Sequence, residues 1–191
     1  MRLRNDCNTI VREAIAQVRP DAAVALALAG KEFGAGKLIL VAVGKAAWSM
    51  AHAAWESLDR KPDGGIVITK HGHSEGPIGN LEVWEAGHPV PDDGTFAATS
   101  RALELTQDLK PEDRVLFLLS GGGSALFEKP IISTEELQDI TRQLLACGAD
   151  ITEMNTIRKH LSTVKGGRFA LHCAPAQVFA VVLSDIIGDP L

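Results

Sequence analysis

The sequence predicts an α/β fold: a doubly wound, mainly parallel sheet with helices on both faces, in a Rossmann-like three-layer α/β/α arrangement. Short runs rich in Val, Ile and Leu recur along the chain, and stretches of helical periodicity separate most of them. Several of these runs are almost continuously apolar, which is typical of strands buried on both faces of a parallel sheet. Strands and helices that alternate in this way form βαβ units with right-handed crossovers.

Five strands and four main helices are expected after a helical preamble. The preamble covers residues 1–30, is split at Pro20 and ends at Gly30. Asp92, Ser133 and Asp150 each stand where a helix is expected to begin, and Ser133 opens a capping box. The strands are predicted over residues 38–43, 65–69, 81–85, 114–119 and 178–183, and the helices over 46–58, 92–109, 133–147 and 151–162.

Residues 1–191 are expected to form one domain, since this length is within the range of a single core. The last strand runs into residues 184–191 without a helix that would cover it. From this we expect a truncated protein. The apolar surface left uncovered on the last strand would favour self-association into a homo-oligomer.

The composition argues against several classes of protein. The 19 basic and 24 acidic side chains give a formal charge of -5, and the basic residues are not clustered, which disfavours nucleic acid as a partner. No apolar run reaches the roughly 18 residues needed to span a bilayer, and the first residues do not resemble a signal peptide. We therefore expect a cytoplasmic protein with no membrane partner. Three distant cysteines, Cys7, Cys147 and Cys173, suit reduced thiols better than disulfides or a zinc site.

The strongest candidate for a binding site is a run of three glycines between two serines, directly after the strand at 114–119. Without side chains, backbone N–H groups can converge on an anion, and the flanking hydroxyls can donate further hydrogen bonds to phosphate. A flexible turn is the alternative, but ligands of open α/β sheets lie beyond the carboxyl ends of strands. No Walker A motif occurs in the chain. The residues of this glycine loop are Ser120, Gly121, Gly122, Gly123 and Ser124.

A lysine stands at the junction between the first strand and its helix. Lys45 follows Gly44, where a cation meets the positive end of a helix dipole. That placement is favourable if lysine and helix share an anionic phosphate or carboxylate, and the alternative is a lysine that extends into solvent. The single glycine disfavours dinucleotide binding, which requires G-x-G-x-x-G at this point.

A third candidate lies on the helix expected over 151–162. Asn155, Arg158 and Ser162 are spaced so that a helix would place them on one face. Such a face is ordinarily just solvated, but here a basic, glycine-rich turn follows that can open a helix toward an anion. The residues of this turn are Lys165, Gly166 and Gly167.

Acidic and histidine residues supply the remaining candidates. Asp185 and Asp189 follow the last strand and could hold magnesium or orient a hydroxyl, although Asp185 could equally cap a turn. His71, His73 and His88 suggest a metal site, but no third and fourth ligand has suitable spacing. Hydrogen bonding at the edge of a site is the favoured role for these histidines.

Together these segments resemble the amino-terminal domain of the glycerate 2-kinase family, whose members carry a second, smaller domain. The matching motifs are VAVGKAA, GIVITKHGH, EAGHPVPDDG, FLLSGGGSAL, NTIRKHLSTVKGGR and VLSDIIGDPL, and they occur in the family's order. The resemblance implies phosphorylation of D-glycerate to 2-phosphoglycerate with ATP and Mg²⁺ as cofactors. It also implies that Lys45 is the catalytic lysine and faces the transferring phosphoryl group.

The resemblance further implies an active site in the cleft between two domains. The glycine loop would hold phosphate, together with Lys165, Gly166 and Gly167. The substrate side of the cleft would be lined by His71, Asn155, Arg158, Asp185 and Asp189, with Asp189 as the magnesium ligand. The arginine that the family is thought to use beside the lysine belongs to the second, carboxyl-terminal domain, and the resemblance implies that this domain is absent from the chain.

Two alternatives of a different class stay open. Some members of the family are called hydroxypyruvate reductase, which would make the chain an NAD(P)-dependent oxidoreductase. The missing fingerprint disfavours this, as does Lys70 in place of an acidic residue after the second strand. The other alternative is a non-catalytic module that binds a nucleotide or a sugar phosphate.

Overall fold

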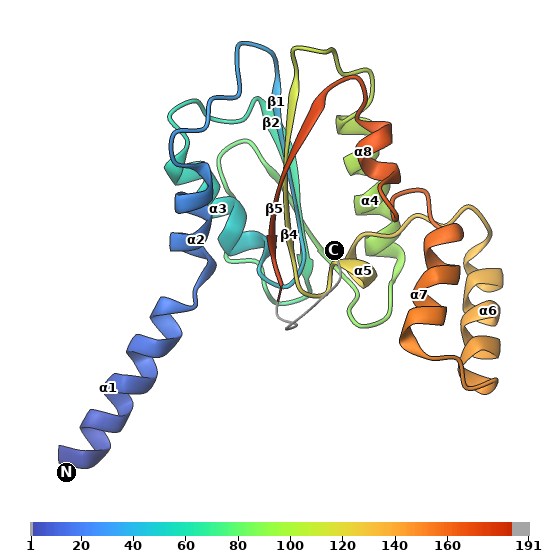
Figure 1. Cartoon of the computed structure of the whole chain (residues 1–191), viewed down its shortest axis with the longest axis horizontal. Coiled ribbons are helices and arrows are strands. Elements are labelled where there is room, and N and C mark those ends of the chain that lie inside the picture. The colour runs from blue at the N-terminus through green and yellow to red at the C-terminus, as the bar shows by residue number, and fades with distance from the viewer. Residues whose placement is uncertain (1, 185–191) are drawn as a thin grey trace.

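The computed structural model describes residues 2–184. Its centre is a sheet of five strands that all run parallel, in the order β3-β2-β1-β4-β5 (Figure 1). The strands are β1 (Leu38–Val43), β2 (Gly64–Lys70), β3 (Glu82–Ala86), β4 (Arg114–Ser120) and β5 (Gln177–Leu183). The predicted parallel α/β fold is confirmed, and each strand lies within one residue of its expected bounds.

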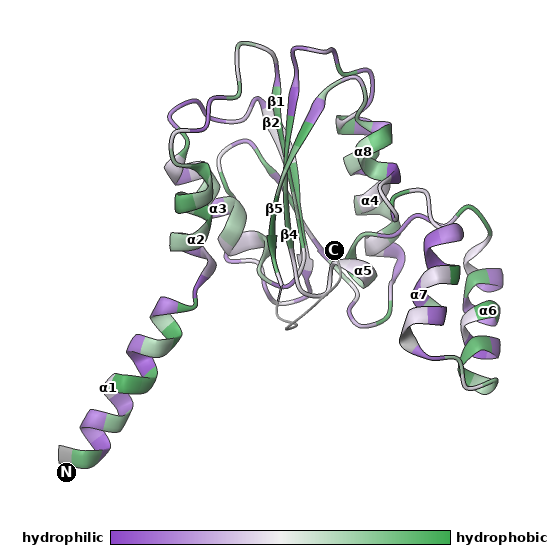
Figure 2. Cartoon of the chain, in the orientation of Figure 1, coloured by the Kyte–Doolittle hydropathy of each residue, from purple (hydrophilic) through white to green (hydrophobic). Residues whose placement is uncertain are grey.

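The helices cover the sheet on both faces. α2 (Pro20–Leu28) and α3 (Ala47–Ser57) pack on one face and share an apolar core with it. A second apolar core joins the other face to α4 (Asp93–Leu105), α5 (Gly123–Leu126) and α8 (Arg168–His172). Figure 2 shows the strands mainly in the hydrophobic colour, whereas the loops and the helices α1, α6 and α7 carry many hydrophilic residues. Every residue of the central strand β1 is buried, as expected for a strand that has helices on both faces of the sheet.

Two parts of the chain lie away from these layers. α1 (Arg2–Gln17) projects from the body of the molecule, and α6 (Thr134–Ala146) and α7 (Ile151–His160) form a pair beside the α4 layer (Figure 1). The edge strand β5 is only partly covered, and Val182 is exposed. None of the helices within residues 2–184 is long and apolar enough to cross a membrane.

The predicted caps are present, but two helices are shorter than expected. Asp92, Ser133 and Asp150 each accept a hydrogen bond from a backbone N–H in a capping box. α4 ends at Leu105 rather than residue 109, because the Thr106 hydroxyl donates to the carbonyl of Ala102 and Asp108 takes a positive φ of 56°.

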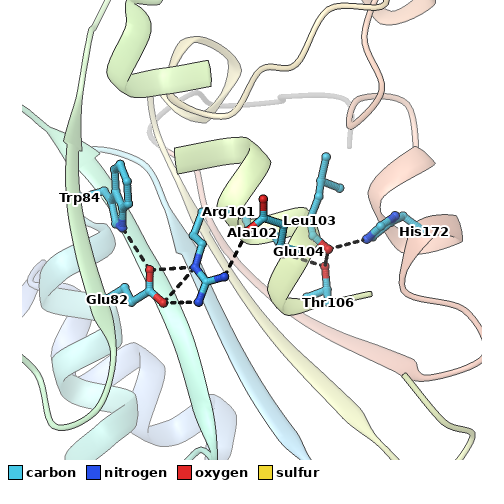
Figure 3. Close-up of polar contacts among 8 residues, drawn as sticks. All are labelled: Glu82, Trp84, Arg101, Ala102, Leu103, Glu104, Thr106 and His172. Atoms are coloured by element: carbon cyan, nitrogen blue, oxygen red, sulfur yellow. Dashed lines mark hydrogen bonds and ion pairs between the residues drawn. The ribbon is translucent and has the colours of Figure 1, made fainter. Parts of the chain in front are cut away.

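Side-chain contacts fix α4 between its neighbours (Figure 3). The guanidinium of Arg101 binds the carboxylate of Glu82 on β3 through two nitrogens, at 3.0 and 2.7 Å. On the other side of α4, the ring of His172 from α8 lies 2.9 Å from the carbonyl oxygen of Leu103. These contacts orient α4 against the sheet, and with it the capped loop that precedes the helix.

The Glu82–Arg101 pair should make stability depend on pH. Hydrogen bonds from Arg101 hold the pKa of Glu82 below its ordinary value. A lowered pKa in the folded state stabilises the fold above the unfolded-state pKa, and this contribution is lost as pH falls. We expect the free energy of unfolding to fall less between about pH 6 and pH 3 in Glu82→Gln than in the unaltered protein. Urea unfolding at several pH values measures this, and equal slopes in both proteins would contradict it.

Candidate functional site

The loops that follow the strands all emerge at one edge of the sheet, the lower edge in Figure 1, because every strand is parallel. Val43, at the end of β1, is paired with Ile68 of β2 and Leu119 of β4. The glycine loop after β4 therefore lies beside the Lys45 turn after β1. The topology brings together two segments that are far apart in the sequence.

Ser120 joins these two loops. Its buried hydroxyl accepts a hydrogen bond from the Ala46 N–H at 3.0 Å and lies 3.5 Å from the carbonyl oxygen of Val43. Gly44 has a φ of 125°, and a Cβ there would lie 2.2 Å from the Ser120 hydroxyl oxygen. The N–H of Lys45 donates to the Gly121 carbonyl at 2.9 Å. The Ser120 hydroxyl thus holds the two loops in register.

The middle of the glycine loop is approached closely from two sides. Gly122 takes the left-handed conformation, with a φ of 88°. A Cβ on Gly122 would lie 2.9 Å from the ring of His88 and 3.2 Å from Cγ of Lys45. A residue without a side chain is required at this point both by its conformation and by its neighbours.

Lys165 holds the far end of the loop. Its ammonium lies 2.8 Å from the Ser124 carbonyl, 2.9 Å from the Phe127 carbonyl and 2.9 Å from the carboxylate of Glu128. An ammonium has three N–H donors, and three acceptors surround this one. Burial lowers the pKa of Lys165, while the Glu128 carboxylate opposes that shift. This geometry favours a positioning role for Lys165 over direct contact with phosphate.

A cleft of about 590 Å³ brings together most of the residues predicted around the glycine-rich turns. Its floor includes the rings of Phe117, Phe127 and Phe169, whose centroids lie 5.2 to 6.0 Å apart. Its polar lining includes seven of the predicted residues: Gly123, Ser124, Asn155, Arg158, Lys165, Gly166 and Gly167. An apolar aromatic floor with a cationic and glycine-rich rim can take a planar ring that carries an anionic group.

Ser162 does not share the predicted helix face with Asn155 and Arg158, so that expectation is wrong. α7 ends at His160, and residue 162 instead forms a bridge with Pro130. The Ser162 hydroxyl is buried and accepts from the N–H groups of Val164 and Lys165 at 3.3 and 3.4 Å. It shapes the turn that carries Lys165 and does not line the cleft.

His71 lies on the other flank of the site. Its Nε2 is 2.8 Å from the carboxylate of Asp92, the residue that caps α4. Partial burial would raise the pKa of Asp92, but hydrogen bonds from His71, Thr95 and Gly87 hold it at about 2. His71 is therefore anchored at the edge of the site by a carboxylate that stays ionised at neutral pH.

The predicted magnesium ligands cannot be placed. Asp185 and Asp189 lie outside the described residues. From residue 2 to residue 184, no group of three or more His, Cys, Asp or Glu side chains is arranged to hold a metal ion.

Two features of the site were not predicted from the sequence: the burial of Glu128 and the contact of the candidate residue His88 with the glycine loop. Glu128 is buried at 2% exposure, and its Oε1 has no hydrogen-bond partner in the described part of the chain. The sequence offers one signal for the burial of Glu128: an acidic residue occurs within the apolar segment that follows the glycine loop. His88 reaches the glycine loop from β3, and burial together with the cations Lys45, Lys70 and His73 lowers its pKa. Its position just after a strand makes His88 a candidate, but its contact with Gly122 depends on the order of the strands in the sheet.

The fold is a parallel α/β domain, and its candidate site lies at the carboxyl ends of the strands. The family described as a domain of unknown function, DUF4147, matches residues 6–191. The chain therefore belongs to the DUF4147 family.

Among known proteins, the chain is 56% identical over 184 residues to D-glycerate 2-kinase of Thermotoga maritima, which covers 95% of this chain and 44% of that protein. It is 42% identical over 159 residues to a putative hydroxypyruvate reductase of Agrobacterium vitis, which covers 81% of this chain and 35% of that protein. The crystal structure of glycerate kinase from Thermotoga maritima matches with a TM-score of 0.89 and 54% identity, over 99% of this chain and 46% of that one. The chain thus spans less than half the length of these relatives.

The Lys165–Glu128 pair gives a direct test of what holds the glycine loop. Lys165→Met should reduce the free energy of unfolding by about 3–5 kcal/mol, because it leaves the Glu128 carboxylate buried without its partner. The double variant Lys165→Met/Glu128→Leu should lose clearly less, since it removes the uncompensated charge as well. Urea unfolding of both variants measures these losses. A double variant that loses as much stability as Lys165→Met, or more, would contradict the prediction.

Proposed function

We propose that the protein is the nucleotide-handling part of an ATP-dependent kinase that phosphorylates D-glycerate to 2-phosphoglycerate. The observation that carries the proposal is the cleft in which the glycine loop meets an aromatic floor and the polar residues of α7. The name of the Thermotoga maritima relative, a D-glycerate 2-kinase at 56% identity, supports the substrate.

The cleft suggests how the nucleotide lies. A purine is a flat aromatic ring, so it suits the floor formed by the three phenylalanines. Arg158 on the rim offers a guanidinium with planar donors for phosphate oxygens, and Gly166 and Gly167 let a phosphate approach the backbone closely. The phosphate chain then leads along Gly123 and Ser124 into the glycine loop. Lys165 supports this path indirectly, because its ammonium fixes the carbonyls on which the loop is built.

Lys45 stands where the transferring phosphoryl group would leave the glycine loop. Its side chain packs against Gly122, and its backbone is tied to Gly121. Phosphoryl transfer forms a bond between the acceptor hydroxyl oxygen and the γ-phosphorus while the bond to the leaving oxygen of ADP breaks, and the hydroxyl proton passes to solvent. Negative charge is spread over the transferring oxygens, and a fixed ammonium stabilises it. Magnesium bound through Asp189 remains part of the proposal, outside the described residues.

The reductase alternative has the names of two Agrobacterium vitis relatives in its favour and the geometry of β1 against it. A dinucleotide site at this edge needs a glycine fingerprint after β1. Here the single Gly44 is followed by a lysine, and Gly44 itself packs against Ser120. ATP, and not NADH, is therefore expected to raise the melting temperature of the protein.

Gly122→Val should weaken ATP binding by about tenfold or more, which corresponds to about 1.4 kcal/mol. A β-branched side chain resists the positive φ of Gly122 and would meet the His88 ring. Isothermal titration calorimetry with ATP measures the effect. Gly64→Ala is the matched control, because its added methyl group meets no atom within 4 Å. Unchanged affinity in a folded Gly122→Val protein would remove the glycine loop from the phosphate site.

Lys45→Ala should lower the rate of phosphoryl transfer by about 100-fold or more, and ATP affinity far less, because the charge contact strengthens in the transition state. The test uses a chimera in which this chain replaces the matching part of the Thermotoga maritima relative. Glycerate-dependent ADP formation is measured with and without the substitution. A chimera that keeps near-normal turnover after Lys45→Ala would exclude the lysine from the reaction.

A further inference from the structure

The contact between His88 and Gly122 spans the site. His88 follows β3 and Gly122 follows β4, and the sheet order places β2 and β1 between these two strands. Three strand spacings of about 4.8 Å amount to about 14 Å. The segment that ends in His88 therefore crosses the carboxyl ends of both central strands before it meets the glycine loop.

A lysine lies at the carboxyl end of each of the two strands that it crosses. Lys70 is the last residue of β2, and Lys45 follows β1 with Gly44 between them. Ile66 and Ile68 of β2 belong to the apolar core on the α4 face, so alternation places Lys70 on that face, beside its register partner Ala86 of β3. The ring of His73 lies 3.1 Å from the Lys45 carbonyl oxygen. We call Lys45, Lys70, His73 and His88 the basic cluster.

The acidic residues nearest to His88 in the sequence, Glu85 and Asp92, already have hydrogen-bond partners. Oε1 of Glu85 accepts hydrogen bonds from the N–H groups of Gly72 and Ser74, at 3.0 and 3.1 Å. The Asp92 carboxylate is bound to His71, Thr95 and Gly87. In the part of the chain that the structure describes, Lys70 forms no ion pair. Both carboxylates are therefore held by the loops that carry them and by His71, and neither forms an ion pair with Lys70.

We propose that the basic cluster binds the carboxylate of the acceptor, a small hydroxy acid, with Lys70 and His88 as the residues that recognise it. This inference rests on the proposed function. An acceptor held by its carboxylate between Lys70 and His88 lies against Gly122 and Lys45, where the γ-phosphate would end. In a hydroxy acid such as D-glycerate the carboxylate is bonded to the carbon that bears the 2-hydroxyl. Binding of the carboxylate therefore positions the 2-hydroxyl near the γ-phosphate. A neutral polyol of the same size lacks the anchoring charge.

The test measures binding of D-glycerate without nucleotide. Calorimetry or ligand-observed NMR on the 191-residue chain should show saturable binding of D-glycerate and none of glycerol. Lys70→Gln and His88→Gln should each weaken D-glycerate binding by at least about tenfold, and leave ATP binding unchanged. Lys110→Gln and His52→Gln are the matched controls, since both residues are exposed and lie outside the cluster. Circular dichroism and urea midpoints confirm that the variants fold.

Three results would overturn the inference. One is the absence of saturable D-glycerate binding to the unaltered chain. Another is binding that both substitutions leave unchanged. The third is an equal loss of ATP and D-glycerate affinity in the folded variants, which would assign the cluster to the phosphates. If D-glycerate binds as expected but ATP does not bind, the proposed kinase function fails and the carboxylate site stands.

Discussion

The whole site depends on the junction between β1 and β4, where the Ser120 hydroxyl fits against Gly44. Parallel pairing brings the two strand ends together, and the hydrogen bond from the Ala46 N–H to the Ser120 hydroxyl fixes the position of one loop relative to the other. Any side chain at position 44 would collide with this hydroxyl. Because the glycine loop and the Lys45 turn are locked here, neither loop would have to reorganise to bind the phosphate chain in the proposed site.

From this junction the site extends in two directions. Toward β5, the glycine loop runs into α5 and is held by the ammonium of Lys165, which in turn depends on the buried carboxylate of Glu128. The aromatic cleft opens on that side. Toward β3, the loop meets His88 and the basic cluster. One flank thus suits a large planar nucleotide and the other a small anion, with Gly122 between them.

The sequence predicted the fold and the parts of the site that depend on backbone pattern. The strands, the capping boxes and the place of the glycine loop follow from local periodicity and from the rule that parallel strands end at one edge. The roles of individual polar side chains did not follow. Lys165 has the residue type of a phosphate ligand, but tertiary contacts with Ser124, Phe127 and Glu128 surround its ammonium. The expectation for Ser162 is wrong because α7 ends two residues before it. The contact of His88 with Gly122 crosses two intervening strands, and no spacing in the sequence reveals such a contact.

ATP binding along the glycine loop and the cleft beside α7 can be followed by backbone amide NMR of the ¹⁵N-labelled chain, because a titration with ATP reports on each loop separately. The largest shifts are expected on Gly122, Gly123 and Ser124, with further shifts at Asn155, Arg158, Gly166 and Gly167. Saturable shifts confined to other parts of the molecule, such as the α2–α3 face, or no shifts at these amides, would contradict this site for ATP.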